Sequence, residues 1–426
     1  MDVLPNSNVA TFARSGEGNP QPVISKIEDI LDQIINALNE NRILSIPLRN
    51  RRSGNEISVQ FPTNRISEVK KFTCLLQILH MCHEALVSGY ITTKRSDISF
   101  IFLCVHRADF HFPTSFILNF GRNIYYQCPD LFGNQQYVDR LVDDIAFTFG
   151  VGRNALNIVA ASKGLVAGKV LLTLSNDIIL DCRSNSSGIL IPQPEGIRRI
   201  DIGDAQWIMV IEKEATFRSL AASRYFETAA AGVGVLVTGK GYPDLATRQF
   251  LHLVHSAFPE VPIYALVDFD PSGIDIMLTY KRGSRSLGHE DNVTIPRLTW
   301  LGPKSCDVLG RTRYHLSLTS SSQADQYVVV TPPSSQDTRP STTRPSHVLS
   351  ANSFEVASSL TTYDRQKAAR LLSKIHDEQA TGTDETGLVH ELQMMLMLNF
   401  KAEIQIVDDD GDVTRWLDEK LSDIIH

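Results

Sequence analysis

The spacing of hydrophobic residues changes about halfway along the chain. In the first half, apolar residues recur at intervals of three and four, which is the period of amphipathic helices. Helices are predicted on this basis at residues 24–38, 72–86, 139–149 and 155–160. Short strands are predicted around Val59 and Phe61, at residues 164–174 and at residues 188–191. The last two helices and the strands that follow them favour a helix-turn-helix with a wing, a common DNA-reading arrangement, but a generic α+β unit fits equally well.

In the second half, continuous apolar runs alternate with amphipathic helices. The runs lie at residues 207–211, 233–237 and 263–267, and the helices at residues 216–226, 244–258 and 272–280. Strands of this kind, separated by helices, are typical of a parallel sheet covered on both faces. Further helices are predicted at residues 364–375 and 389–398. The predicted fold class is therefore α+β in the first half and α/β in the second.

Length and composition suggest where these regions begin and end. A chain of 426 residues is long for one core and indicates two or three domains. Residues 1–22 are polar and are expected to form a disordered tail, and residues 317–353, rich in Ser, Thr and Pro, a flexible linker or insertion. The remaining parts are predicted as a DNA-binding domain, an α/β domain and a C-terminal helical part, at residues 23–195, 200–316 and 354–426.

The overall charge and hydropathy restrict the location and the partners. The formal net charge is -7, whereas nucleic-acid-binding domains usually have a basic surface, so a DNA-binding groove would have to be local. No apolar run approaches the roughly 18 residues that a membrane helix needs, and residues 1–20 contain no apolar signal core. A cytosolic or nuclear protein without membrane association is expected.

Three acidic residues follow the predicted strands of the α/β domain. Glu212 comes directly after the first strand, Asp268 after the third, and Asp270 two residues later. Ligands of parallel sheets bind beyond the carboxyl ends of the strands, so these side chains are expected at one edge. Neighbouring carboxylates repel one another unless a cation joins them, and Mg2+ prefers oxygen ligands. A magnesium site for phosphoryl chemistry is predicted, although each acid taken singly is more often an ordinary turn residue.

A pair of tyrosines stands ahead of the predicted helix-turn-helix. Tyr125 and Tyr126 end the run that begins at Arg122. A phenol, with a reference pKa of about 10, becomes a covalent nucleophile when a base, a cation or a metal activates it. Arginine can orient a phosphate with two parallel hydrogen bonds. From these residues alone, a core or interface tyrosine is the more frequent case.

Five sequence blocks together resemble the family of topoisomerase VI A subunits and meiotic break-forming proteins. They are IYYQCPDLFGNQ, LNIVAASKGLVAG, VIEKEATF, VTGKGYPD and LVDFDPSGIDIM, in the order in which the family has them. The resemblance covers residues 24–310 and resumes from residue 359 to the end. It implies an N-terminal winged-helix (CAP-like) domain that carries a nucleophilic tyrosine, followed by a Toprim domain with a parallel sheet.

The resemblance also implies roles for individual residues. The matching residues are Tyr126 for the nucleophile, Arg122 for the catalytic arginine, Glu212 rather than Glu214 for the Toprim glutamate, and Asp268 and Asp270 for the DxD pair that binds Mg2+. Segments that resemble DNA-contacting loops contain Lys163, Gly164, Lys240 and Tyr242. Tyr125 is the reserve candidate for the nucleophile.

The activity implied by the resemblance is cleavage of double-stranded DNA at the start of meiotic recombination, in the nucleus. The tyrosine attacks a phosphodiester, forms a 5′-phosphotyrosyl link and releases a 3′-hydroxyl. One tyrosine cuts one strand, so a homodimer is expected, together with other meiotic break proteins and a topoisomerase VI B-like subunit. One alternative is a type IIB topoisomerase A subunit that relaxes DNA. The chain has no GxxxxGK[ST] loop, so this activity would need an ATPase partner. The other alternative is a non-catalytic DNA-binding scaffold.

Residues 96–121 depart from the family pattern. They separate a TTKR segment from the tyrosine run, and they are rich in Phe, Ile and Leu without a sustained period. A loop insertion and the translation of an unspliced intron both explain these 26 residues, whose number preserves the reading frame, and we favour the intron. In a genuine insertion, Arg95 competes with Arg122 for the place of the catalytic arginine.

Mass spectrometry of the native protein tests the intron hypothesis. We expect no peptide from within residues 96–121 and a peptide that joins Arg95 directly to Arg122. Detection of a tryptic peptide that begins at Ala108 would show instead that the segment is translated.

Overall fold

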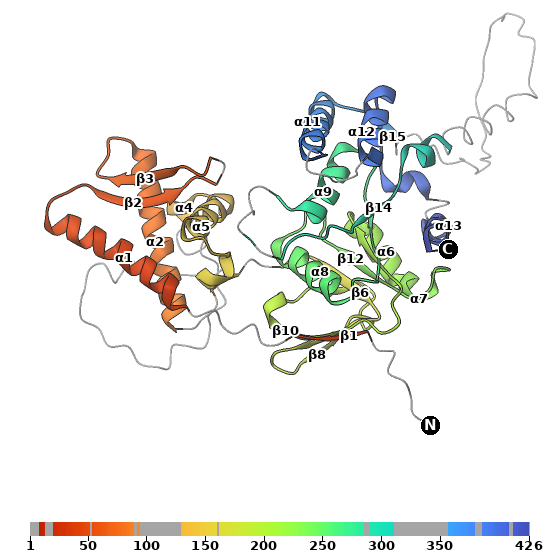
Figure 1. Ribbon diagram of the computed structural model, residues 1–426, viewed down its shortest axis with the longest axis horizontal. Coiled ribbons are helices and arrows are strands. Elements are labelled where there is room, and N and C mark those ends of the chain that lie inside the picture. The colour runs from red at the N-terminus through yellow and green to blue at the C-terminus, as the bar shows by residue number, and fades with distance from the viewer. Residues whose placement is uncertain are drawn as a thin grey trace, which may run out of the picture.

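The computed structural model describes residues 8–12, 20–51, 53–88, 92–93, 129–159, 162–284, 290, 292–310, 357–379, 386–408 and 412–425. Figure 1 shows a helical unit with a β-hairpin, formed by the N-terminal part of the chain, beside a larger α/β unit. None of the described helices combines the length and the apolar character that crossing a membrane requires.

Within the described residues, the N-terminal unit packs four helices against a hairpin. The helices are α1 (Gln21–Asn39), α2 (Ile66–Ser88), α4 (Pro129–Phe132) and α5 (Gln135–Phe149), and β2 (Leu44–Arg49) pairs antiparallel with β3 (Glu56–Phe61). One apolar cluster joins these elements, and Ile27, Ile78 and Val142 within it are fully buried. The helical periods predicted for α1, α2 and α5 are thus confirmed.

Local capping explains why α5 begins earlier than its apolar period. The side chain of Asn134 accepts the N–H of Tyr137, which satisfies a donor of the first turn. Gly150 ends the helix in the left-handed conformation, with φ at 67°. The first turn is polar, so the hydrophobic pattern alone places the start at residue 139.

The short helix predicted at residues 155–160 is wrong. The chain there forms the 3-10 helix η3 (Arg153–Leu156) and then β5 (Ile158–Val159), which pairs in parallel with β4 (Thr92–Thr93). Asn157, in the left-handed conformation at φ 55°, ends the helix after one turn. The predicted helix-turn-helix therefore lacks its second helix.

The α/β unit is built on a six-stranded sheet. In spatial order its strands are β14 (Thr299–Gly302), β13 (Ile263–Leu266), β11 (Trp207–Ile211), β12 (Gly234–Thr238), β6 (Leu165–Gly168) and β9 (Ile189–Leu190). The first four are parallel, and β6 and β9 extend the sheet antiparallel. The continuous apolar runs are confirmed as buried parallel strands.

The strands predicted as a wing belong to this unit instead, so that interpretation of residues 164–191 is wrong. Besides β6 and β9, they supply two strands of a second sheet, ordered β1 (Val9–Thr11), β10 (Ile197–Asp201), β7 (Leu171–Leu174) and β8 (Ile179–Asp181). Which sheet each strand joins depends on pairing between residues far apart in the sequence, and the hydropathy pattern does not encode that pairing. Strand β1 also gives structure to three residues of the tail expected to be disordered (Figure 1).

Helices cover both faces of the large sheet (Figure 1). One face packs against α8 (Leu245–Ala257), α9 (Pro271–Arg282), α11 (Thr362–Gln379) and α12 (Thr386–Leu398), and the other against α6 (Glu214–Ala222), α7 (Tyr225–Thr228) and α13 (Thr414–Ile425). Within β11, Val210 contributes to the first apolar cluster and Ile211 to the second. Side chains alternate between the faces, as the pleat requires.

The remaining elements are short. They are the 3-10 helices η4 (Pro194–Gly196) and η7 (Ile404–Val407), and the antiparallel pair β15 (Ala357–Ser359) and β16 (Phe400–Ala402). The single helix predicted at residues 216–226 is divided into α6 and α7 by Arg224, which has a left-handed φ of 55°.

A buried ionic cluster fixes the end of the N-terminal unit. The carboxylate of Asp143 pairs with Arg51 at 2.8 Å and also with Arg153. The N–H of Arg153 donates to Glu290 Oε1 at 3.0 Å, so the cluster also contacts the α/β unit. Removing a carboxylate from such a cluster leaves buried positive charge uncompensated.

We predict that Asp143→Ala destabilises the protein by about 3 kcal/mol, because Arg153 loses its buried partner and Arg51 loses Asp143 while keeping Asp144. Urea unfolding of the variant measures this loss. Glu40→Ala removes the exposed partner of Arg42 and serves as the control, with an expected change below about 0.5 kcal/mol. Equal stability of the two variants would show that the buried cluster contributes nothing.

Candidate metal centre

Two predicted metal ligands meet at the carboxyl edge of the sheet. Glu212 directly follows β11, and Asp268 lies two residues beyond β13, the parallel neighbour of β11. The backbone N–H of Asp268 donates to Glu212 Oε2 at 2.9 Å. The parallel pairing of the two strands therefore brings together residues that are far apart in the sequence.

The third predicted ligand, Asp270, begins helix α9. Its side chain accepts the N–H of Gly273 at 2.6 Å, which caps the helix. Gly273 has no room for a side chain, because a Cβ there would collide with the carbonyl oxygen of Asp268. The glycine thus allows the loop that contains both aspartates to lie against the start of α9.

Burial and mutual repulsion make this edge unfavourable for negative charge. Burial, together with the charges of Asp268 and Asp270, raises the pKa of Glu212 to about 7. Burial also raises the pKa of Asp268, against the opposing effects of Lys213 and of the N–H of Ile404. The pKa of Asp270 is raised for the same reason. A cation bound here would remove this penalty.

The residues at this edge fit a hydrated magnesium ion. In the described ranges, no three His, Cys, Asp or Glu side chains form a ready-made metal site. Mg2+ retains several waters and is often held by one or two carboxylates, so it does not need a closed protein cage. Glu212 and Asp268 supply carboxylate oxygens on two segments that a backbone hydrogen bond joins, and Asp270 is coupled to Glu212 electrostatically.

The structure also distinguishes the two candidate glutamates. Glu214 lies in the first turn of α6, where its carboxylate pairs with Arg218 at 2.6 Å and with Lys240 at 3.1 Å. These two cations lower the pKa of Glu214. Glu214 is therefore neutralised by protein groups, whereas Glu212 faces the two aspartates.

The loop of residues 239–243 lies next to Glu212. The N–H of Gly241 donates to the carbonyl oxygen of Glu212 at 2.9 Å. Lys240 and Gly241 both have left-handed backbones, with φ of 55° and 82°. Their geometry turns the chain back over the end of β11, so two expected DNA-contacting residues, Lys240 and Tyr242, lie on the loop bonded to Glu212.

The other two expected DNA-contacting residues adjoin the same loop. Lys163 is exposed, and its ammonium donates to the carbonyl oxygen of Lys240 at 3.3 Å. Gly164 is buried, and a Cβ there would collide with the Thr247 hydroxyl and crowd the carbonyl oxygen of Thr238. The structure thus gives Gly164 a packing function that allows the loop with Lys163 to approach α8 and β12.

Tyr242 is held by α9 and α11. Its hydroxyl donates to Asp275 Oδ2 at 2.5 Å and accepts from Lys367 at 2.7 Å, and the ammonium of Lys367 lies 5.3 Å from the ring centroid. The tyrosine remains 44% exposed. Lys367 was not identified from the sequence, because nothing in α11 marks one lysine as facing the sheet edge.

The predicted nucleophile and its neighbours cannot be placed. Tyr126, Tyr125, Arg122 and Arg95 lie outside the described residues. The next described residue is Pro129, the first of α4, three residues after Tyr126. Their roles remain predictions.

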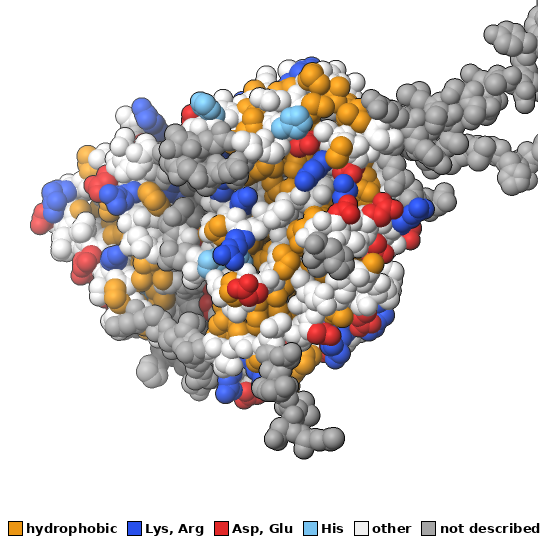
Figure 2. Space-filling model, turned by 45° about the vertical axis from the view of Figure 1, so that its right-hand side comes forward, with side chains coloured by type: hydrophobic (Ala, Val, Ile, Leu, Met, Phe, Trp, Pro, Cys, Tyr) orange, Lys and Arg blue, Asp and Glu red, His pale blue; other side chains and the backbone are white. Residues whose placement is uncertain are grey.

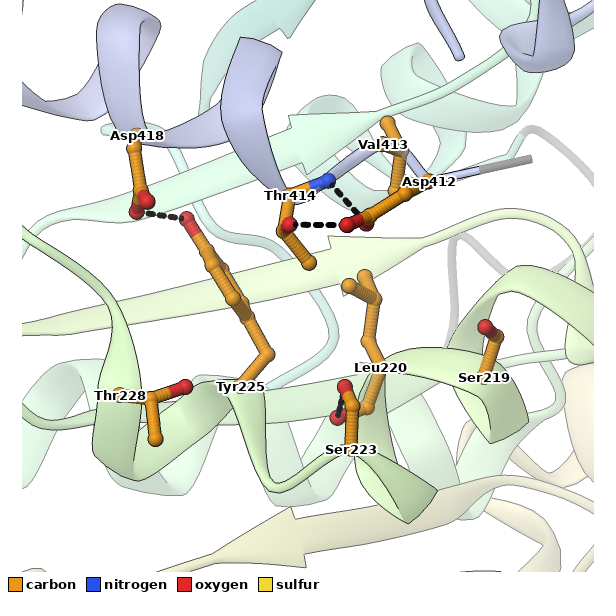
Figure 3. A pocket seen from close by; sticks show the side chains of 9 residues that line it. All are labelled: Ser219, Leu220, Ser223, Tyr225, Thr228, Asp412, Val413, Thr414 and Asp418. Carbon is orange, nitrogen blue, oxygen red and sulfur yellow. Dashed lines mark hydrogen bonds between the residues drawn. The ribbon is translucent and has the colours of Figure 1, made fainter. Parts of the chain in front are cut away.

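A cavity of about 360 Å³ lies apart from these carboxylates (Figure 3). It is lined by residues of α6, α7 and α13 and of the turn before α13. Its two carboxylates have structural functions: Asp418 accepts the hydroxyl of Tyr225 at 2.8 Å, and Asp412 accepts the N–H of Thr414 at 2.9 Å. The cavity therefore contains none of the predicted site residues.

The distribution of charged side chains on the surface is consistent with the formal net charge of -7. On the face in Figure 2, lysine and arginine side chains are interspersed with acidic ones rather than gathered into one large patch. Contacts with a nucleic acid would thus depend on local groups such as Lys163 and Lys240.

We predict that the metal-free protein loses stability as the pH rises from about 5 to 8. The pKa of Glu212 is raised from 4.5 to about 7, so the folded state binds the proton more tightly than the unfolded state. This contribution is complete below pH 4.5 and is lost as the pH passes 7, with a loss on the order of 2 kcal/mol.

Urea unfolding across this pH range, with chelator present, measures the loss. Glu212→Gln should flatten the profile, and so should Mg2+, because it compensates the charged form. A profile unchanged in Glu212→Gln would assign the pH dependence to other groups.

Comparison with known proteins identifies both parts of the chain. The family of Toprim domains of Spo11 and the topoisomerase 6 A subunit matches residues 207–339, and the family described as "Type IIB DNA topoisomerase" matches residues 121–158. The second match begins at the last residue of the atypical segment, residues 96–121. The matched ranges contain the parallel strands β11 to β14 with their acidic edge, and helices α4 and α5, whereas β6 and β9 lie outside them.

Related proteins cover most of the chain. Meiotic recombination protein SPO11 of Mus musculus is 31% identical over 303 residues, which are 67% of this chain and 69% of that protein. SPO11 of Homo sapiens is 31% identical over 331 residues, 71% and 76% of the two chains. Meiotic recombination protein rec12 of Schizosaccharomyces pombe is 29% identical over 296 residues, 67% and 74% of the two chains. The chain therefore belongs to the family of Spo11 proteins and topoisomerase VI A subunits, which are topoisomerase-like DNA transesterases.

Proposed function

We propose that this protein makes the DNA double-strand breaks that initiate meiotic recombination, with Tyr126 as the nucleophile. Family membership and the names of the relatives support the reaction and its meiotic role. The observation that carries the assignment of the site is the contact between Asp268 and Glu212 at the carboxyl edge of the Toprim sheet. A pair of partly buried carboxylates there suits phosphoryl transfer with a metal.

The reaction is a transesterification. The phenolic oxygen of Tyr126 forms a bond to the phosphorus, and the bond between the phosphorus and the 3′ oxygen breaks. The phenol loses its proton, and the 3′ oxygen leaves as a hydroxyl. No water is consumed, so the 5′-phosphotyrosyl link conserves the energy of the phosphodiester and the step is reversible. Arg122 would orient the phosphate and stabilise its negative charge.

Glu212 and Asp268 would hold Mg2+, with Asp270 beside them. The bound ion would neutralise charge that develops on the phosphate in the transition state. The Toprim domain is a metal-binding fold, and burial beside Asp268 and Asp270 raises the pKa of Glu212, a penalty that a bound cation would offset. Lys163, Lys240 and Tyr242 would contact DNA beside the metal, and Gly164 would shape the loop that presents Lys163.

The N-terminal unit would serve as the winged-helix DNA-binding domain. Its helices α2 and α5 pack on the β2–β3 hairpin in one apolar cluster, and we assign the wing to this hairpin in place of residues 164–191. The domain would comprise residues 20–159 and end before β6. The Toprim domain would then begin near residue 162, earlier than the expected residue 200, and would include residues 357–425.

A break in both strands requires two copies of the chain. The family acts on DNA as a dimer with partner proteins, and a twofold axis matches the symmetry of the duplex. We propose a homodimer that acts in the nucleus with other meiotic break proteins and a topoisomerase VI B-like subunit. DNA relaxation with ATP would support the topoisomerase alternative, and retained DNA binding without cleavage would support the scaffold.

Covalent trapping tests the nucleophile. The protein and its B-type partner are incubated with Mg2+ and end-labelled duplex DNA and then denatured. We expect label on wild type and on Tyr125→Phe, and none on Tyr126→Phe. Loss of label in Tyr125→Phe alone would move the chemistry to Tyr125. Absence of label from every protein, with DNA binding intact, would favour the scaffold.

We predict that Glu212→Gln and Asp268→Asn each reduce cleavage roughly 100-fold or more, because the metal supplies several kcal/mol of transition-state stabilisation. DNA binding without metal should be unchanged. Glu214→Gln serves as the matched control, since its carboxylate pairs with Arg218 and Lys240. A larger loss in Glu214→Gln than in Glu212→Gln would reverse the assignment of the Toprim glutamate.

A further inference from the structure

A segment near the C-terminus returns to the loop that contains the metal-binding aspartates. Phe269, which lies between them, exchanges two backbone hydrogen bonds with Ala402, at 2.8 and 3.0 Å. Two residues later, the N–H of Ile404 donates to Asp268 Oδ1 at 2.8 Å. Both Phe269 and Ile404 are fully buried. The aspartate loop is therefore attached to a part of the chain beyond the range matched by the Toprim family, residues 207–339.

Lys213 joins the same two parts of the chain. Its ammonium lies 3.3 Å from Asp268 Oδ1, 2.8 Å from Glu403 Oε2 and 3.0 Å from Gln405 Oε1. A lysine ammonium has three N–H donors, and here three acceptors surround it. The side chain of Lys213 is 24% exposed, and that of Asp268 is 14% exposed. Lys213 is thus a half-buried lysine engaged within the protein, whereas Lys163 is exposed.

Both donors to Asp268 select the same oxygen. Ile404 N–H and Lys213 approach Oδ1, and in the described part of the chain no hydrogen bond reaches Oδ2. A carboxylate held in this way has a defined orientation, with one oxygen occupied and the other available to a ligand. In many metal sites, a further residue bonds the oxygen or nitrogen of the ligand side chain that does not bind the metal. Such residues commonly influence the affinity of the site for the metal.

We propose that Lys213 is a positioning residue for Asp268: with the N–H of Ile404 it holds Oδ1, so that Oδ2 is presented to the divalent cation. The inference rests on the proposed function, because it takes Asp268 as a metal ligand. It assigns Lys213 no contact with DNA. It also makes Glu403 and Gln405 part of the support of the metal site, because both hold the Lys213 ammonium.

Removing Lys213 has two opposite effects on the affinity for the cation, so the direction in which the affinity changes is informative. Loss of a positive charge near the site strengthens cation binding by Coulomb's law. Loss of the orientation of Asp268 weakens it, by roughly tenfold when a residue supporting a metal ligand is removed. If Lys213 positions Asp268, weakening should dominate.

The test is Mn2+ binding to the full-length, DNA-free protein, followed by the electron paramagnetic resonance of free Mn2+. We expect Lys213→Met to raise the dissociation constant roughly tenfold. The Mg2+ concentration at half-maximal cleavage, with the B-type partner present, should rise by a similar factor. Cleavage at saturating Mg2+ should return close to wild type, and DNA binding without metal should be unchanged.

Three further variants control the experiment. Lys213→Arg keeps the charge but not the compact ammonium, so it should raise the dissociation constant by less than Lys213→Met. If Lys213→Met does not fold, a higher dissociation constant for Lys213→Arg than for wild type supports the inference, and an unchanged constant overturns it. Glu403→Gln, which weakens the hold on the ammonium, should change binding in the same direction by about twofold. Arg218→Met, on the same helix with a side chain 45% exposed, should leave Mn2+ binding unchanged.

Unchanged or tighter Mn2+ binding by Lys213→Met would overturn the inference. So would weaker DNA binding with normal Mn2+ binding, since Lys213 would then contact a phosphate. A different result concerns the proposed function: absence of Mn2+ binding in wild type, or equal binding by Asp268→Asn, would refute the metal assignment itself.

Discussion

The register between β11 and β13 is the constraint on which the site depends. These parallel neighbours place Glu212 and the loop with Asp268 at one edge, where the N–H of Asp268 bonds the carboxylate of Glu212. Burial at this edge, together with the charges of Asp268 and Asp270, raises the pKa of Glu212 to about 7. A cation bound at this edge would offset the penalty that burial and repulsion impose on the ionised carboxylates.

Several separate parts of the chain hold this edge in place. The loop of residues 239–243 bonds the backbone of Glu212, and Gly273 lets α9 start directly against the aspartate loop. Residues 400–405 close the other side, through the bridge between Phe269 and Ala402. Because residues 239–243 and 400–405 are far from the aspartate loop in the sequence, the geometry of the site depends on the whole α/β unit being folded. Rigid support of this kind is what a metal-dependent phosphoryl transfer requires.

The N-terminal unit provides a second, separate core. Its helices and hairpin share an apolar cluster that contains no residue of the large sheet. Arg153 and Glu290 connect the two units through a hydrogen bond of 3.0 Å rather than through a common core. Separate cores allow the two units to change their relative position, as the proposed reaction between two protomers would need.

The sequence by itself determined the local elements and the candidates for the reacting groups. Apolar periods identified α1, α5 and α8, and continuous apolar runs identified β11, β12 and β13, because burial on one or both faces leaves a regular pattern. Acids placed directly after those runs identified Glu212 and Asp268. Only the tertiary structure decided which strands pair, so β6 and β9 joined the Toprim sheet instead of forming a wing. It alone brought Lys213, Ile404 and Gln405 to Asp268, because contacts between distant segments leave no period or motif in the sequence.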